Sequence, residues 1–374
     1  MTALDLLDAL VRIDSVNPGL DPGGAGERQI AAFVAEWGRG AGLRVEELES
    51  TPGRPSVILR GGHDAGGRRL LLCGHLDTVS LAGSRDALTP RVAGDRLYAR
   101  GAYDMKGGLA AALTACRAAS VAGIDGEVIV AAVADEEHAS LGIQDVLARL
   151  DPAGIDAAVV TEPTELQVGT AHRGFVWTEV TVSGVAAHGS RPHLGADAIL
   201  AAGHHLVAFD ALDQELRNRP HPFLGSGNLH ASLIAGGTGE STIPDRCVFT
   251  VERRTLPGES LDRVEADVAG VLERSRPADP RVTTITRTLL HRPPMQTPHD
   301  AEIVRTLLAA AGPDTNLAPM SYWADSAFIA AAGIPTVLYG PGGDGAHADA
   351  EWVSRSGTNT VAAVLTRLAQ DFCG

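Results

Sequence analysis

The sequence predicts an α/β protein: a three-layer domain with a mostly parallel sheet, interrupted by a smaller α+β domain. Up to residue 160, short β-rich runs alternate with helical patterns, and this alternation is typical of a parallel sheet covered by helices. A different order of elements then fills about 115 residues, which is enough for a small α+β domain. Helix and strand signals resume from residue 301 to residue 372, so the first domain continues after the insertion.

The first part of the chain opens with two helical patterns. Residues 4–13 carry apolar side chains at helical spacing and are followed by Asn17-Pro18-Gly19, a stop signal. A second amphipathic pattern covers residues 27–37, and an Ala-rich stretch at 108–119 predicts a third helix. The expected strands are residues 56–60, 69–73, 128–133 and 157–160.

The middle of the chain predicts a ferredoxin-like βαββαβ order. Its strands are expected at residues 176–183, 231–234, 247–253 and 281–290, and its helices at 195–216 and 261–275. We therefore place the larger domain at residues 1–173 and 292–374, and the inserted domain at residues 174–291.

Composition limits the function. The 374 residues are 44% hydrophobic and 21% charged, and 46 acidic against 31 basic side chains give a net charge of −15. A nucleic-acid binder or a protein held on an anionic membrane needs clustered Lys and Arg, so the charge argues against both classes. Four cysteines without a CxxC pair indicate neither a disulfide framework nor a thiolate metal site. The acidic start lacks a signal peptide's basic region, and no apolar run reaches the ~20 residues that span a bilayer, which predicts a cytoplasmic protein.

Several loops carry residue types that suit metal chemistry. His75 and Asp77 follow the expected strand 69–73 and point to the same side of an extended chain, as a ligand and its orienting partner would. Asp104 lies in a Gly-rich loop just before the Ala-rich helix, where free amides stabilise a carboxylate. A structural histidine and a helix-capping aspartate are the alternatives for these two loops.

Three consecutive acids, Asp135, Glu136 and Glu137, follow the expected strand 128–133. Like charges this close are costly to hold together without a cation or a proton between them. A solvated acidic loop is the alternative.

Glu162 follows the apolar run 157–160 in the same way, and His347 comes after the Gly-rich turn 340–343. Ligand sites of α/β proteins lie at the carboxyl ends of parallel strands. Taken together, the two histidines and the carboxylates fit a two-metal site with nitrogen and oxygen ligands.

These motifs, in this order and over nearly the whole chain, resemble the zinc-dependent M20 peptidases and deacylases. The branch of acetylornithine deacetylase and succinyl-diaminopimelate desuccinylase is the most similar. The resemblance implies two Zn²⁺ ions, for which Co²⁺ could substitute. It implies that one ion is bound by His75 and Glu162, that the other is bound by Glu137 and His347, and that both share Asp104.

The resemblance also implies roles around the ions. Asp77 is expected to hold the His75 ring in place. Glu136 is expected to be the general base that takes a proton from the attacking water. A cis peptide is expected after the bridging acid, at Asp104–Met105.

Three expected site residues lie in the inserted domain, which by resemblance is a lid and dimerisation domain of a homodimer. His188 is expected to reach the partner subunit's active site and to stabilise the oxyanion, although a surface histidine is the alternative. Arg254 is expected to hold the substrate's carboxylate in a bidentate pair, unless it pairs with Glu252 or Glu259. Ser241 stands where the family often has Asn, which puts the polar substrate contacts in doubt.

Two polar residues of the last part carry weaker signals. Glu351, four residues after His347, is a candidate for supporting the metal ligands. Asp325 falls where the family has a polar stretch facing the active site, although helix capping explains it equally well.

The predicted function is hydrolysis of the amide bond of N-acyl amino acids by a metal-activated water. The Thr-Glu-Pro-Thr form around Glu162 resembles the deacetylase branch. A dipeptidase or carboxypeptidase acting on small peptides is the alternative on the same scaffold. A non-catalytic metal-binding homologue is disfavoured because Glu136 is present, and a serine hydrolase because the sequence has no GxSxG elbow.

Overall fold

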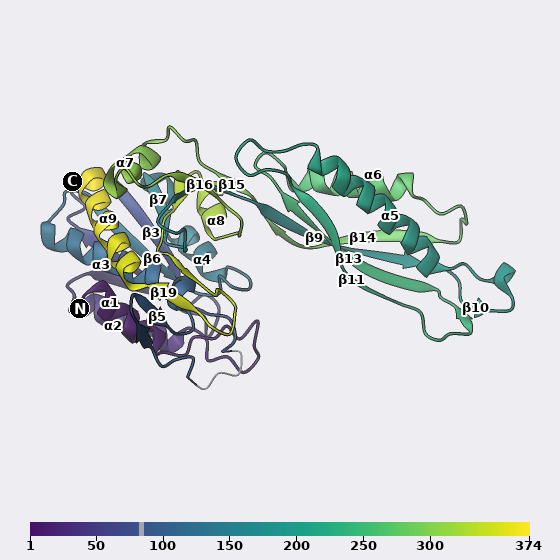
Figure 1. Cartoon of the computed structure of the whole chain (residues 1–374), viewed down its shortest axis with the longest axis horizontal. Coiled ribbons are helices and arrows are strands. Elements are labelled where there is room, and N and C mark those ends of the chain that lie inside the picture. Colours follow the sequence, from purple (N-terminus) through teal and green to yellow (C-terminus); the bar gives the residue numbers. More distant parts are fainter. Residues whose placement is uncertain (82–85) are drawn as a thin grey trace. The chain divides into compact units, whose positions relative to one another are not determined.

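The computed structural model describes residues 1–81 and 86–374 and divides into two compact units (Figure 1). The first unit comprises Met1–Thr170, Gln296–Ala318 and Ala324–Gly374, and the second comprises Ala171–Met295 and Pro319–Trp323. The second unit is therefore mainly an insertion in the first. No helix in the described ranges is long and apolar enough to cross a membrane.

Within the residues described, a nine-stranded sheet has the order β1-β2-β6-β3-β7-β17-β8-β15, with β16 beside β8. Its centre, from β6 to β17, is parallel, whereas β1, β2 and β8 join their neighbours antiparallel. The bounds are β1 (Arg44–Leu48), β2 (Ser56–Gly62), β3 (Arg69–His75), β6 (Glu127–Val133), β7 (Ala157–Val160), β8 (Val168–His172), β15 (Met295–Gln296), β16 (Leu317–Met320) and β17 (Thr336–Leu338).

The mostly parallel centre confirms the predicted fold class. All residues of β6 and β7 are buried, as expected of parallel strands covered on both faces. The sequence analysis missed β1, which is polar and half exposed and pairs antiparallel with β2 at the border of the sheet.

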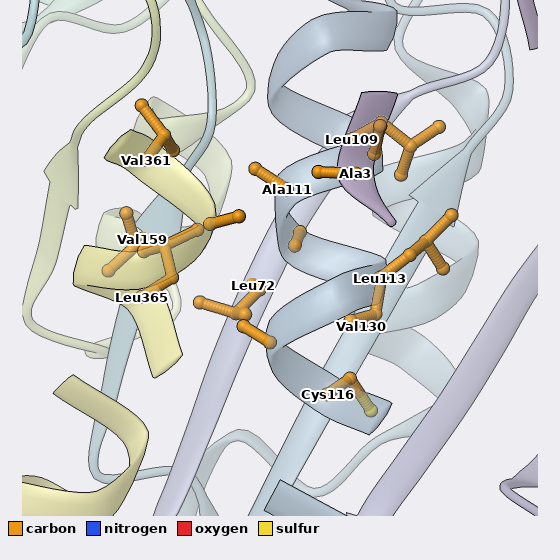
Figure 2. Packing of buried hydrophobic residues seen from close by; sticks show 14 of the residues in the cluster. Ala3, Leu72, Leu109, Ala111, Leu113, Cys116, Val130, Val159, Val361 and Leu365 are labelled. Carbon is orange, nitrogen blue, oxygen red and sulfur yellow. The ribbon is translucent and has the colours of Figure 1, made fainter. Parts of the chain in front are cut away.

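Helices of the first unit pack on this sheet, except that α1 packs on α3 and α9. They are α1 (Ala3–Val11), α2 (Arg28–Gly40), α3 (Gly107–Ala122), α4 (Leu141–Arg149), α7 (Glu302–Ala311), α8 (Ser326–Ala331) and α9 (Arg355–Cys373). Helices α3 and α9 lie side by side over β3 and β6, and Leu113 and Leu365 meet Leu72 and Val130 in one hydrophobic core (Figure 2). A Cβ on Gly108 would lie only 1.8 Å from a backbone oxygen of β7's loop, so a glycine there lets α3 approach the sheet closely.

A small second sheet of the first unit presents the loop that carries His347. Its strands, in the order β18-β19-β5-β4, are β4 (Arg91–Ala93), β5 (Arg96–Tyr98), β18 (Gly343–Asp344) and β19 (Trp352–Ser354). His347 lies in the tight connection between β18 and β19 and has a φ of 62°.

The second unit contains a four-stranded antiparallel sheet in the order β11-β13-β9-β14. Its elements follow the predicted βαββαβ order: β9 (Gly174–Ser183), α5 (Ala198–Arg217), β11 (Asn228–Gly236), β13 (Arg246–Thr255), α6 (Leu261–Arg274) and β14 (Thr283–Arg292). Val180 and Val182 of β9 are buried in the core shared with the helices, whereas Trp177 on the other face is exposed. Two short strands, β10 (Ala187–His188) and β12 (Thr242–Ile243), pair with each other separately.

Candidate metal centre

Three of the polar loops meet because they follow neighbouring parallel strands. His75 ends β3, Glu136 follows β6, and Glu162 follows β7, and these strands are adjacent in the sheet. The carboxyl ends of parallel strands meet at one edge. The backbone N–H and the hydroxyl of Thr161 donate to the Cys73 carbonyl at 2.9 and 3.1 Å, which fixes the Glu162 loop against β3.

Asp104 lies in the turn Ala102–Lys106, directly before α3, and the backbone of Asp104 and Met105 is not helical. The Glu351 carboxylate holds this turn and accepts the guanidinium of Arg100 at 2.8 Å. It also accepts hydrogen bonds from the backbone N–H groups of Gly101, Tyr103 and Asp104, at 2.9, 2.8 and 3.0 Å. The Asp104–Met105 peptide is cis, as the resemblance implies.

The two oxygens of Asp104 face different histidines. Oδ1 lies 3.1 Å from Nε2 of His75, and Oδ2 lies 3.3 Å from Nε2 of His347. Glu162 stands on the His75 side, with Oε1 3.7 Å from its Nε2. Glu137 stands on the His347 side, with Oε2 3.0 Å from its Nε2. The structure therefore brings all five predicted metal ligands together, in two groups that share Asp104.

Burial and mutual repulsion act on the carboxylates. Burial raises the pKa of Glu136 and Glu162 well above the usual value, and it also raises the pKa of Glu137. The charge of Asp104 adds to this effect for Glu137 and Glu162. For Asp104 itself, burial is outweighed by hydrogen bonds from the two histidine rings, which lower its pKa.

The histidines respond in the opposite sense. Burial disfavours a charged His75, but the Asp104 hydrogen bond and the charge of Glu162 outweigh it and raise its pKa well above the usual value. Hydrogen bonds to Asp104 and Glu137 raise the pKa of His347 to about 10. The carboxylates thus favour positive charge between them, which a divalent cation would supply.

The donor set fits divalent metal ions. Ligand atoms lie within 4.8 Å of one another in two groups, His75–Asp104–Glu137 and His75–Glu136–Glu162. These two groups share His75 and do not include His347, so they differ from the predicted pairing of the ligands. Among the described residues, Glu137 Oε1 is a buried oxygen without a hydrogen-bond partner, and a cation would satisfy it. Imidazole and carboxylate ligands suit zinc. The role of each ligand stays a prediction.

Asp77 contacts the His75 ring through its backbone. Nδ1 of His75 lies 2.9 Å from the carbonyl oxygen of Asp77 and 3.7 Å from its carboxylate. The carboxylate instead accepts the backbone N–H groups of Glu136 and Glu137, each at 3.2 Å. Asp77 therefore ties the acidic loop to the end of β3.

His188 and Ser241 lie together in the second unit. His188 pairs with Thr242 in the β10–β12 ribbon, and the Ser241 carbonyl accepts the Gly189 N–H at 2.7 Å. The His188 ring is exposed, and its Nδ1 lies 2.7 Å from the Ser190 hydroxyl. The predicted roles of both residues toward the metal centre stay predictions.

Arg254 forms the ion pair that the sequence analysis kept as its alternative. Its Nε donates to Glu252, and its guanidinium lies 5.0 Å from the ring centroid of Phe175. The neighbouring Arg253 pairs with Glu259. A substrate contact of Arg254 stays a prediction.

Asp325 is the N-cap residue of α8 and is buried. Burial is the main cause of the raised pKa of Glu136, and the negative charge of Asp325 adds to it. Asp325 therefore adds to the negative electrostatic potential at Glu136.

The sequence analysis missed a buried polar network beside the acidic loop. The Asn17 amide donates to Asp77 at 2.7 Å and to Asp135 at 3.0 Å. Arg54 pairs with Asp135 at 2.7 Å and with Glu27 at 2.6 Å. In the sequence, Asn17 indicates only the end of a helix. No local pattern could have revealed its partners, which lie 60 and 118 residues away in the sequence.

An interrupted α/β fold with histidines and carboxylates gathered at the carboxyl ends of its strands is typical of metal-dependent hydrolases. Comparison with known families gives the particular family. The profile of Peptidase family M20/M25/M40 matches residues 71–371, and the chain belongs to this family. The predicted resemblance is therefore confirmed, and the protein is a family M20 hydrolase.

Curated relatives carry one recurring name. The acetylornithine deacetylase of Myxococcus xanthus is 33% identical over 330 residues, which cover 85% of this chain and 84% of that protein. The acetylornithine deacetylase of Salmonella arizonae is 28% identical over 382 residues, which cover 98% and 96%.

Solved structures share the fold. Aminopeptidase PepT from Bacillus cereus gives a TM-score of 0.80 at 17% identity, covering 100% of this chain and 98% of that one. The Bacillus subtilis YXEP protein, described as a dinuclear metal binding peptidase from the M20 family, gives 0.77 at 16% identity, covering 99% and 97%.

Proposed function

We propose that this protein is a two-zinc amidohydrolase that removes the acyl group from N-acyl amino acids. The observation that carries the proposal is the position of Asp104, whose two oxygens lie 3.1 Å from His75 and 3.3 Å from His347. Glu162 stands beside the first histidine and Glu137 beside the second. Each ion would therefore have one imidazole, one glutamate and one oxygen of Asp104.

Glu136 is the proposed general base. When bound, the ions would polarise the scissile carbonyl and lower the pKa of the attacking water. Glu136 would accept a proton from that water and pass it to the leaving amine. Burial raises the pKa of Glu136, which suits a carboxyl group that must both accept and release a proton near neutral pH. The Asp77 carboxylate accepts a hydrogen bond from the backbone N–H of Glu136 at 3.2 Å and so holds this residue in place.

The choice of an acylated amino acid as substrate rests on the relatives. Proteins named acetylornithine deacetylase match 85% and 98% of this chain. We assign the substrate's carboxylate to Arg254, which would have to exchange its present partner Glu252 for that anion. Ser241 is the polar candidate for contacts with the rest of the substrate.

We further infer that the second unit is the lid and dimerisation domain of a homodimer. β11 is the end strand of its sheet and presents Leu233 and Ile234, which are 70% and 60% exposed. On the adjacent helix α5, Leu200 and Val207 are 67% and 73% exposed. An exposed strand edge with apolar side chains favours pairing with a second chain. In that dimer His188 would act as the oxyanion donor for the partner subunit.

The test is release of free amine by the zinc-loaded protein. The substrates are N-acetyl, N-formyl and N-succinyl amino acids, with simple dipeptides beside them, each with and without a chelator. The proposal expects chelator-sensitive turnover of an acylated amino acid. Turnover of dipeptides alone would assign the protein to the peptidase branch instead, and no turnover with zinc bound would refute the proposal.

A matched pair of variants identifies the base. Glu136→Gln should retain bound zinc and lose about 10²–10⁴-fold in kcat, the range for a general base. Glu36→Gln is the same change at an exposed position of α2 and should leave kcat unchanged. Equal kcat in the two variants would remove Glu136 from the mechanism.

A further inference from the structure

The side chain of Asn17 lies between two buried carboxylates. Its Nδ2 is 2.7 Å from Asp77 Oδ2 and 3.0 Å from Asp135 Oδ1, so both amide hydrogens are used. Its Oδ1 accepts the Gly19 N–H at 2.8 Å. Asn17, Asp77 and Asp135 are each 0% exposed. The amide is therefore fully hydrogen-bonded in a site closed to water.

Both carboxylates hold the acidic loop. Asp77 accepts the backbone N–H groups of Glu136 and Glu137, each at 3.2 Å. Asp135 begins the loop with a φ of 67°, a strained value for a residue other than glycine, and its carbonyl accepts the Ser140 N–H at 2.5 Å. By joining Asp77 to Asp135, Asn17 fixes the loop on both sides of Glu136.

A neutral donor is the residue type that this position requires. Asp135 already pairs with Arg54, which also neutralises Glu27 at 2.6 Å. A carboxylate in place of the Asn17 amide would face two like charges at hydrogen-bond distance, and burial magnifies that repulsion.

The segment around Asn17 also touches the other loops of the metal centre. Its backbone N–H donates to the Thr78 carbonyl at 2.8 Å, just beyond Asp77. Four residues earlier, the Ile13 carbonyl accepts a hydrogen bond at 3.1 Å from the ammonium group of Lys106, the last residue of the Asp104 turn. On its other side, a Cβ on Gly19 would lie 2.7 Å from the His138 ring. The turn after α1 thus packs against three loops of the candidate metal centre that lie far apart in the sequence.

We infer that Asn17 is a positioning residue, whose amide sets the places of Glu136 and Glu137 relative to His75. The role toward catalysis rests on the proposed function of Glu136 as base. The role toward metal binding depends only on the geometry of Glu137.

The test compares two changes at Asn17 with the same changes at Asn359, which is exposed on α9. Asn17→Asp keeps the shape and replaces the donor with an acceptor, whereas Asn17→Ser keeps one donor. Supporting side chains of metal sites contribute about 10–100-fold to activity or metal affinity. We expect kcat to fall about 100-fold in Asn17→Asp and about 10-fold in Asn17→Ser, with KM changed by less than about threefold.

Zinc affinity, measured by competition with a chelator, provides a readout without substrate. It should weaken about 10-fold in Asn17→Ser, while both Asn359 variants bind as the unchanged protein does. If Asn17→Asp does not fold, Asn17→Ser decides. A lower unfolding temperature with unchanged kcat and zinc affinity would overturn the inference. If the unchanged protein hydrolyses no substrate, the proposed function fails, and zinc affinity alone then supports or overturns the role of Asn17.

Discussion

Replacement of Glu351 should destabilise the protein and weaken its metal centre together. Glu351 is 5% exposed, and its carboxylate pairs with Arg100 and accepts hydrogen bonds from the backbone N–H groups of Gly101, Tyr103 and Asp104. A hydrogen bond to a charged group is worth about 1.5–3 kcal/mol, and breaking a buried ion pair costs about 3–5 kcal/mol. These contributions overlap, so we expect Glu351→Ala to lower the free energy of unfolding by about 3–5 kcal/mol.

Denaturant unfolding with and without zinc measures this loss of stability. A double-mutant cycle then measures how much of the loss comes from the pairing of Glu351 with Arg100. Arg100→Met alone and Glu351→Met alone each leave one charge buried, whereas the double variant leaves neither. The coupling energy should therefore be about 1–3 kcal/mol. A loss below about 1 kcal/mol for Glu351→Ala, or a coupling energy near zero, would refute the reasoning.

Further predictions concern the second unit, the pH dependence of stability and two glycine positions. His188→Ala should retain bound zinc and lose about 10²–10³-fold in kcat, and unchanged turnover would exclude the oxyanion role. Burial lowers the pKa of His172 from 6.5 to about 4, so between these two pH values the unfolded chain binds a proton that the folded protein does not. The free energy of unfolding should therefore decrease as the pH falls from 6.5 to 4, by at most about 3 kcal/mol. Urea titrations should find a smaller decrease in His172→Gln. Gly108→Ala would place a Cβ 1.8 Å from the Thr161 carbonyl and should abolish soluble folding. Gly203→Ala in α5 adds a Cβ that would meet nothing within 4 Å beyond its chain neighbours and the backbone of its own helix, so it should raise the melting temperature slightly.

The parts of the site that the sequence could predict are those that strand order dictates. His75, Glu136 and Glu162 each follow an apolar run, and parallel neighbours bring the ends of such runs to one edge. The motif order then associated Asp104 and His347 with them through a family resemblance. These residues can be recognised as site candidates from the sequence because they stand next to predicted strands, glycines or other acidic residues.

The supporting contacts carry no such signal. Asn17, Arg54 and Glu27 are common residue types beside ordinary turn and helix patterns, and their partners lie far along the chain. Burial alone turns them into a network, and burial is a property of the assembled fold. The same reason explains Asp77, whose carboxylate was expected on the His75 ring but accepts two backbone N–H groups instead.

The position of β17 has a consequence for the synthesis of the protein. This strand is formed by Thr336–Leu338, yet it lies between β7 and β8, which the ribosome completes long before it. The central sheet of a nascent chain therefore keeps an open gap while the whole inserted unit emerges, and His347 follows later still. A chain that stops early would hold the clustered acids without their second imidazole. The candidate metal site can therefore be completed only after residue 347 has been synthesised.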